Sequence, residues 1–551
     1  MAIRTDKRPN ILLITADQQR YDTIGAGGRY YMKTPNLDLL AREGCMFSHA
    51  YSPNPVCIPA RHNLLTGLSA RYHGFDDNYF DEIRSIPYNL PTFPQILSDS
   101  GYDTIAIGKM HFQPYRRHNG FHRLYLMDEI PRYREDDDYA VYLREQKLGN
   151  IQSIHGVRHL LYMLPQRSLV PEEHHGSKWV ADKTIEYLDE NNGKRPFLMW
   201  SGFIAPHPPF DVPDSWADLY KGVSLPAPAK TKTPLSALAE ENKHIADYPD
   251  ESYLRRAREL YFAAISFVDH QVGRILFKLR EIGQIDNTLI IYTSDHGEML
   301  GDLGTYQKFL PYDFASRIPM IIRYPQRIKQ GSLCDDFVDL NDLLPTMLDA
   351  ADVNYPDKNI SLPGESLFKN SGQKDRSVQY VEHCKDKRRW VSLRSKSYKY
   401  NYYYGGAYKE LFDMTSDPQE TMNLLYDNPS MEHLAIATGM HRQLAEIEAV
   451  QGLEGYIQNG DFIGLEPYHT QPYREMNFPL YPSQLTKQVE IEHQNTIEDE
   501  ILIAIEKEPI VNLEALDLET FKIKSGLKDK QVNEILMRWQ QKLKDAPGSA
   551  D

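Results

Sequence analysis

Short apolar runs alternate with longer amphipathic segments over the first two thirds of the chain. Continuous apolar runs of strand length occur at 10–15, 104–107, 196–201, 288–293 and 319–323. Apolar residues at helical spacing predict helices over 37–43, 92–98, 178–191, 253–282 and 341–351. Buried strands that alternate with helices favour an α/β fold, in which a large, mostly parallel sheet is covered by helices on both faces.

The pattern changes near residue 377. Shorter runs with strand character follow at 378–381, 390–394, 398–403 and 409–413, and a helix is predicted over 431–449. They predict a smaller antiparallel sheet with one helix. The tail holds short amphipathic segments at 496–505, 517–525 and 529–542, and Phe478–Pro482 fits an extended arm. We therefore expect a catalytic α/β domain over 1–376, an α+β subdomain over 377–483 and a helical extension over 484–551.

Polar residues come directly after several of the predicted strands. They are Asp17 and Gln18, Lys109 with His111, His207, and Asp295 with His296. In open α/β sheets, sites form outside the carboxyl ends of the strands. Four strands therefore direct ionisable residues at one region. The irregular segment 112–173, rich in Tyr, Arg and acidic residues, is a candidate for substrate specificity.

Charge and cysteine content narrow the function. The formal net charge of −15 argues against nucleic acid or an anionic membrane as the main partner. The mixed charge of the tail argues against a DNA-binding helix-turn-helix, and favours an oligomer contact or a cap over a neighbour's active site. Four scattered cysteines and a polar N-terminus suit a cytoplasmic protein, or a periplasmic or secreted one if a leader has been removed.

The segment Cys57-Ile58-Pro59-Ala60-Arg61 is the strongest chemical signal. Pro59 and the apolar pair Leu64-Leu65 indicate a helix that begins near Cys57. Cys57 would then lie at the positive end of the helix dipole, with Arg61 one turn later on the same face, a suitable pocket for an oxyanion. Cys57 taken alone is equally consistent with a small buried residue.

The polar residues after the first and the fourth strand together form a metal-binding set. Asp17, Gln18, Asp295 and His296 offer two carboxylates, an amide oxygen and an imidazole. An oxygen-rich set with one histidine suits Ca²⁺ or Mn²⁺ better than structural zinc.

The segment from Cys57 to Arg61 resembles the Cys-x-Pro-x-Arg maturation signature of the type I sulfatases, in the alkaline phosphatase superfamily. Further motifs extend the resemblance over about residues 8 to 450. They are Pro9-Asn10-Ile11-Leu12 leading to Asp17, Thr34–Asp38, Gly108-Lys109-Met110-His111, His207 within Pro206–Phe210, Ser294–Gly297, Lys308, and Asp417-Pro418-Gln419-Glu420.

The resemblance implies a mechanism. Cys57 would be oxidised to formylglycine by a maturation enzyme, and its hydrated aldehyde would attack the sulfur of a sulfate ester. Asp17, Gln18, Asp295, His296 and position 57 would bind the divalent metal, with Ca²⁺ expected and Mn²⁺ the alternative. Arg61, Lys109 and Lys308 would neutralise the sulfate, His207 would protonate the leaving alcohol, and His111 would accept a proton when sulfate is expelled. Asn78 is a candidate substrate contact, and a sulfated carbohydrate is the expected substrate.

Two pairs of residues depart from the common sulfatase pattern. Many members have a second aspartate where this chain has Gln18, and an asparagine where it has His296. The Asp-Gln and Asp-His pairs resemble a branch that includes choline sulfatases and phosphonate monoester hydrolases. Hydrolysis of phosphonate monoesters or phosphodiesters is therefore the alternative to sulfate ester hydrolysis. A non-catalytic anion-binding protein, in which Cys57 stays a thiol, is the alternative from another class.

Overall fold

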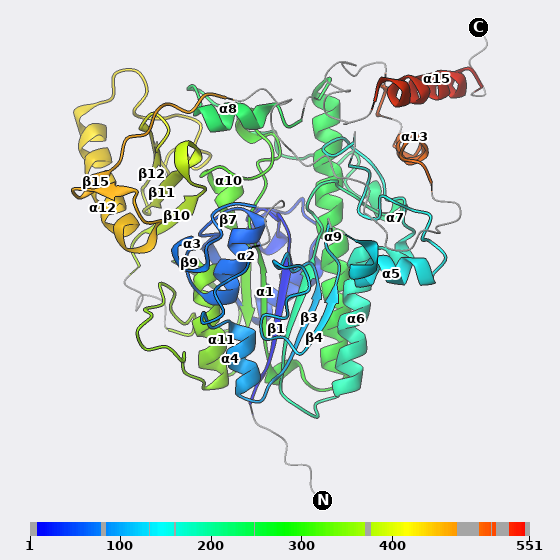
Figure 1. Cartoon of the computed structure of the whole chain (residues 1–551), viewed down its shortest axis with the longest axis horizontal. Helices are drawn as coiled ribbons and strands as arrows, with labels where there is room; N and C mark the ends of the chain where they lie inside the picture. Colours follow the sequence, from blue (N-terminus) through cyan, green and yellow to red (C-terminus); the bar gives the residue numbers. More distant parts are fainter. Residues whose placement is uncertain are drawn as a thin grey trace, which may run out of the picture.

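A nine-stranded sheet forms the centre of the molecule in the computed structural model (Figure 1). The structure describes residues 8–78, 84–129, 131, 133–158, 161–246, 248–369, 376–470, 495–508, 510–513 and 528–545. The strand order is β4-β3-β5-β1-β6-β8-β2-β7, and β9 also pairs with β2. The strands are β1 (Asn10–Ala16), β2 (Cys45–Tyr51), β3 (Asp103–Gly108), β4 (Arg123–Leu126), β5 (Phe197–Phe203), β6 (Thr288–Ser294), β7 (Arg317–Ile318), β8 (Met320–Arg323) and β9 (Ser332–Asp339).

The sheet is mixed. The run β4-β3-β5-β1-β6 is parallel throughout. Strand β8 then pairs antiparallel with both β6 and β2, while β9 runs parallel to β2. The parallel half places the carboxyl ends of five strands along one edge, and this edge carries the candidate site.

Two apolar cores cover the two faces of the sheet, because side chains alternate along each strand. Leu12 and Ile14 of β1 face the core shared with α1 (Pro35–Glu43), α6 (Gly176–Asn191) and α9 (Glu251–Glu281). Ile11 and Leu13 face the core shared with α2 (Cys57–Thr66), α4 (Phe93–Asp99) and α11 (Leu343–Ala351). The prediction of an α/β fold with a large mixed sheet covered on both faces is confirmed.

The five predicted strands are confirmed as β1, β3, β5, β6 and β8, but β2, β4, β7 and β9 were missed. Strand β9 contains the pair Asp335-Asp336, and its first five residues are partly exposed. Strand β4 is four residues long and begins with an exposed arginine. Continuous apolar runs therefore identified the buried strands and missed the short or half-exposed ones.

A second sheet lies beside the first (yellow in Figure 1). It is antiparallel, in the order β10 (Gln379–His383), β11 (Trp390–Arg394), β12 (Tyr398–Tyr403) and β13 (Tyr408–Asp413). Helix α12 (Met431–Gln451) packs on it through a shared core that includes Leu393, Tyr400 and Leu444. The predicted small antiparallel sheet with one helix is confirmed. A two-stranded ribbon, β14 (Ile457–Gln458) and β15 (Asp461–Phe462), follows.

The tail contributes α13 (Ile497–Lys507) and α15 (Asp529–Asp545), which pack on the chain's own catalytic region. The Glu500 carboxylate accepts hydrogen bonds from the backbone N–H groups of Gln152 and Ser153 (2.6 and 2.9 Å). Buried Glu508 lies 2.8 Å from Arg256 of α9. Helix α13 therefore fixes the irregular segment near residues 152 and 153. An oligomer contact through the extension stays a prediction.

The remaining helices are short, and they are α3 (Ala70–His73), α5 (Asp138–Glu145), α7 (Asp214–Ala217), α8 (Ala237–Lys243) and α10 (Asp313–Ser316). The predicted helix over 517–525 and the predicted arm Phe478–Pro482 lie outside the described residues. Within the described ranges, no helix combines the length and apolar character needed to cross a membrane.

Two buried histidines, His62 of α2 and His73 of α3, predict a loss of stability in acid. Burial lowers the pKa of His62 from 6.5 to about 4, and it holds the pKa of His73 well below 6.5. The unfolded chain therefore binds a proton first, so stability is full above pH 6.5 and declines as the pH falls toward 4. His62 alone costs about 2 kcal/mol between neutral pH and pH 5. Urea unfolding at both pH values checks this, and His62→Gln should show a smaller decline. An equal decline in both proteins would contradict the prediction.

Candidate active site

The predicted site residues meet at the carboxyl edge of the parallel strands. Asp17 and Gln18 follow β1, Lys109 and His111 follow β3, and Asp295 and His296 follow β6. All six side chains are buried. Gly108, at the end of β3, has φ of +89°, and a Cβ there would lie 2.0 Å from the carbonyl oxygen of Gly202. Only glycine allows this turn beside β5, and the turn directs Lys109 into the site.

Cys57 is the first residue of α2, as the sequence predicted. Residue 56 before it is extended, and the helix ends at Gly67, whose φ of +70° closes the C-terminus. The Asn78 side chain accepts a hydrogen bond from the backbone N–H of Ile58 at 2.9 Å. Asn78, the candidate substrate contact, therefore lies against the start of α2 and satisfies one of its free N–H groups.

Three donor atoms gather around Sγ of Cys57, and all four atoms lie within 4.8 Å of one another. Nε2 of His296 lies 3.1 Å from Sγ of Cys57 and 3.6 Å from Oδ1 of Asp17. Oδ1 of Asp295 lies 3.8 Å from the same nitrogen. Two carboxylates, an imidazole and the position 57 side chain thus form one buried group. Its two carboxylates and its imidazole are donor types of the predicted divalent metal site.

Arg61 holds the two carboxylates of this group. Its Nε lies 2.8 Å from Asp295 and its Nη2 lies 3.2 Å from Asp17. Its Nη1 donates to the carbonyl oxygen of Lys109 at 2.6 Å. The sequence predicted Arg61 one turn after Cys57 as a cation for the sulfate. In the structure the Arg61 guanidinium instead binds the carboxylates of Asp17 and Asp295, and it thereby orients these two side chains.

Gln18 and Lys308 complete the wall beside Cys57. The Nζ of Lys308 lies 2.7 Å from Oε1 of Gln18 and 3.1 Å from Sγ of Cys57. The amide nitrogen of Gln18 donates to buried Glu298. This contact turns the oxygen of Gln18 toward the site, as metal or substrate binding requires.

His207 lies between Lys308 and Glu129. Its Nε2 lies 2.9 Å from Nζ of Lys308, and its Nδ1 lies 3.1 Å from the Glu129 carboxylate. Glu129 also binds Lys109 at 2.9 Å and Arg158 at 2.7 Å. Because Lys308 donates to Nε2, His207 is neutral in this arrangement, and its Nδ1–H donates to the carbonyl oxygen of Pro208 at 2.6 Å, with the Glu129 carboxylate alongside.

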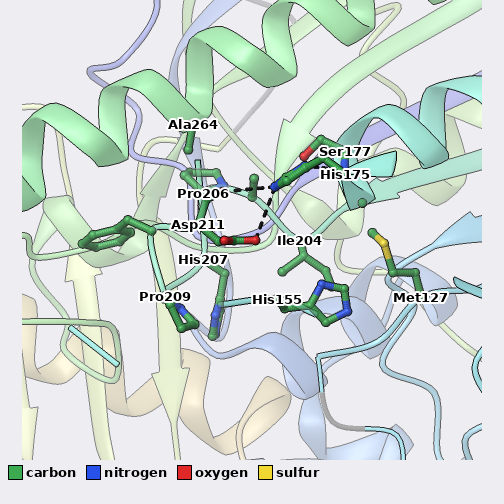
Figure 2. A pocket seen from close by; sticks show the side chains of 13 residues that line it. Met127, His155, His175, Ser177, Ile204, Pro206, His207, Pro209, Asp211 and Ala264 are labelled. Atoms are coloured by element: carbon green, nitrogen blue, oxygen red, sulfur yellow. Dashed lines mark hydrogen bonds and ion pairs between the residues drawn. The ribbon is translucent and has the colours of Figure 1, made fainter. Parts of the chain in front are cut away.

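The segment that carries His207 and the start of helix α6 line the same small pocket (Figure 2). His175 caps α6, because its Nδ1 accepts a hydrogen bond from the backbone N–H of Ser177 at 3.2 Å. Its Nε2 lies 3.3 Å from the Asp211 carboxylate, four residues after His207. This contact fixes the position of the His207 segment relative to α6.

Burial and neighbouring charges set the protonation of the site. Burial and the nearby Asp17 charge raise the pKa of Cys57 to about 12, so the thiol is neutral at physiological pH. Burial lowers the pKa values of His111 and His296 to about 4. Burial and Asp295 oppose ionisation of Asp17, but Lys109, His207 and Arg61 outweigh them and keep its pKa below the ordinary value. Both histidines are neutral and Asp17 is charged, the states that metal binding requires.

Three site residues were missed from the sequence: Glu129, Arg158 and Glu298. Glu298 is part of the motif Ser294–Glu298 and could have been found as a second acidic residue after β6. Glu129 follows the short strand β4, and Arg158 belongs to the irregular segment 112–173. No periodic pattern precedes either residue. Both lie in the segment that the sequence assigned to substrate specificity.

Two family models match the chain. The one described as Sulfatase matches residues 9–353. The one described as N-sulphoglucosamine sulphohydrolase, C-terminal, matches residues 301–450. Neither reaches α13 or α15.

Individual proteins are similar over most of the chain. An arylsulfatase of Clostridium perfringens is 32% identical over 451 residues, which cover 78% of this chain and 92% of the relative. An N-acetylglucosamine-6-O-sulfatase of Bacteroides thetaiotaomicron is 26% identical, covering 76% of this chain and 83% of the relative. The crystal structure of a phosphonate monoester hydrolase of Agrobacterium radiobacter shares the fold. Its TM-score is 0.69 at 24% identity, covering 84% of this chain and 100% of that chain.

Proposed function

The chain belongs to the sulfatase family and is a sulfuric ester hydrolase, and we propose that its substrate is a sulfated carbohydrate. The proposed nucleophile is a formylglycine made from Cys57, and it acts together with a bound divalent metal. The observation that carries the proposal is the position of Cys57. Its Sγ lies 3.1 Å from both Lys308 and His296 and 3.8 Å from Asp17, at the N-terminus of α2. A nucleophile at this position has cations on one side and metal ligands on the other.

The state of the thiol supports the modification. An unmodified Cys57 with a pKa of about 12 is almost entirely protonated at neutral pH, and the thiolate is the reactive form of cysteine. Oxidation to formylglycine supplies a hydrated aldehyde whose hydroxyl group is the nucleophile. Cys57 has no exposed surface in the folded chain. A maturation enzyme therefore has to reach it before the fold closes.

The donor set around Cys57 fits a divalent cation, and we expect Ca²⁺, with Mn²⁺ as the alternative. Asp17, Gln18, Asp295 and His296 would hold it. The charge of Asp295 raises the pKa of Asp17, because two neighbouring carboxylates repel each other when both are ionised. A cation bound between them would remove this repulsion. When bound, such an ion neutralises charge on the ester oxygens and favours ionisation of a bound hydroxyl group.

The remaining site residues neutralise the charge of the sulfate or transfer protons. Lys109 binds Asp17 at 2.5 Å and places a cation beside the position of the sulfate. His207 is the proposed source of the proton for the leaving alcohol, together with Lys308, whose Nζ lies 2.9 Å from Nε2 of His207. His111, neutral and buried, is available to accept a proton when sulfate is released.

A sulfated sugar is the proposed substrate class. The relative named N-acetylglucosamine-6-O-sulfatase supports it. The pairs Asp17-Gln18 and Asp295-His296 keep phosphonate monoesters and phosphodiesters as the alternative substrates. Comparing kcat/KM for a glucosamine 6-sulfate, 4-nitrophenyl sulfate and a 4-nitrophenyl phosphodiester tests the proposal. A phosphodiester rate that exceeds both sulfate rates would favour the alternative. No turnover of any sulfate ester by protein that carries formylglycine would overturn the proposal.

Replacing Lys308 by alanine tests proton transfer to the leaving group. We expect kcat/KM to fall about 100- to 1,000-fold for a sugar sulfate, whose alkoxide needs a proton. The loss should be at least about tenfold smaller for 4-nitrophenyl sulfate, because nitrophenolate leaves without one. Steady-state kinetics with both substrates check this, with exposed Lys221→Ala as the control. Equal losses would assign Lys308 to charge neutralisation alone.

A further inference from the structure

Glu129 is a buried carboxylate inside the site. It lies three residues after β4 and is 6% exposed. One of its oxygens, Sγ of Cys57 and a ring nitrogen of His111 all lie within 4.8 Å of one another. The negative charge is therefore beside the nucleophile position and close to His111, and Lys109 links it to Asp17 of the metal group.

Three cationic or proton-bearing groups keep this carboxylate ionised. Lys109 binds one oxygen at 2.9 Å, and Arg158 binds the other at 2.7 Å. Nδ1 of His207 approaches the second oxygen at 3.1 Å. Burial raises the pKa of Glu129, but His207, Lys109 and Arg158 outweigh it and hold the pKa well below the ordinary value. Glu129 is thus a fixed anion over the working pH range.

A fixed anion at this position discriminates between esters by charge. A sulfate monoester and a phosphodiester each carry one negative charge, whereas a phosphate monoester, whose second pKa is about 6, carries close to two at pH 8. At a separation of about 6 Å and an effective dielectric constant of about 20, the repulsion between two unit charges is worth about 100-fold. Solvent and counter-charges reduce this, so an effect of about 10- to 100-fold is expected.

We propose that Glu129 is a specificity-determining residue that admits singly charged esters and excludes doubly charged phosphate monoesters. The inference rests on the proposed function and adds the charge of the accepted substrate. Arg158 and Lys109 act as positioning residues, because their contacts hold the carboxylate beside the nucleophile.

Three esters that share one leaving group test the proposal in the matured full-length enzyme. They are 4-nitrophenyl sulfate, 4-nitrophenyl phosphate and methyl 4-nitrophenyl phosphate, measured at pH 8. In Glu129→Gln we expect kcat/KM for the phosphate monoester, relative to the sulfate, to rise about 10- to 100-fold. The ratio of the phosphodiester to the sulfate should stay within about threefold, because both carry one charge. Since nitrophenolate leaves without a proton from the enzyme, altered proton transfer does not affect this comparison.

Controls separate charge from structure. Glu129→Asp keeps the charge and should keep the wild-type ratios, and so should Glu432→Gln, which removes an exposed carboxylate from α12. If phosphate monoester turnover is below detection, the Ki of phenyl phosphate against sulfate ester hydrolysis gives the same comparison. An unchanged monoester ratio, or an equal rise for both phosphate esters, would overturn the role of Glu129. Failure of the wild type to hydrolyse any sulfate ester would instead overturn the proposed function.

Discussion

Cys57→Ala is expected to abolish sulfate ester hydrolysis, with a fall in kcat/KM of about 10⁴-fold or more. Removal of a covalent nucleophile costs the enzyme the whole two-step route, and only binding and electrostatic stabilisation remain. Here that remainder is small, because Lys308 and His296 both converge on the position 57 side chain at 3.1 Å. Without the side chain at position 57, Lys308 and His296 would have no nucleophile to activate.

The measurement combines kinetics with mass spectrometry of the peptide that contains position 57. Conversion of cysteine to formylglycine exchanges the sulfur and two hydrogens for one oxygen, so the fraction converted can be read directly. Activity of the wild type should rise in proportion to this fraction. Cys334→Ala is the matched control, because Cys334 is a partly buried free cysteine on β9. Full activity in protein that retains the Cys57 thiol would contradict the prediction.

The sequence predicted the fold where apolar runs are continuous. Strands β1, β5 and β6 are buried along their whole length, so their sequences contain few polar residues. Strand β2 contains Ser48 and His49, both partly exposed, and it was not recognised. Its place in the sheet depends on pairing with β8 and β9, which lie far away in the sequence. Such long-range pairing leaves no local pattern to read.

The site residues likewise fall into those that the sequence predicted and those that it did not. Asp17, Lys109 and Asp295 follow predicted strands, so topology alone brought them together. The partners of Arg61 could not be predicted, because helical spacing gives only the face on which it lies. Glu129 reaches the site from an irregular segment, and its role depends on contacts with Lys109, Arg158 and His207. These contacts are tertiary and have no signature in the sequence.

Asp17→Asn is expected to remove metal binding and to lower kcat/KM about 1,000-fold. The Asp17 carboxylate is shared by Lys109 at 2.5 Å and Arg61 at 3.2 Å, and its other oxygen lies 3.6 Å from His296. An amide in its place removes one of the two carboxylates of the donor group. It also leaves two buried cations with less negative charge, which destabilises the fold by about 3–5 kcal/mol.

These two consequences can be separated by calcium titration in a thermal unfolding experiment. A ligand that binds only the folded state stabilises it by about 2.7 kcal/mol at 100 times its Kd. The wild type stripped by chelation should therefore gain stability with Ca²⁺, and Asp17→Asn should not. Asp342→Asn is the matched control, because Asp342 is buried and pairs with Arg376 at 2.8 Å, outside the donor group. We expect this variant to be less stable than the wild type and yet to respond fully to Ca²⁺. A full response in Asp17→Asn would place the metal elsewhere, whereas loss of the response in both variants would mean that it reports on general stability.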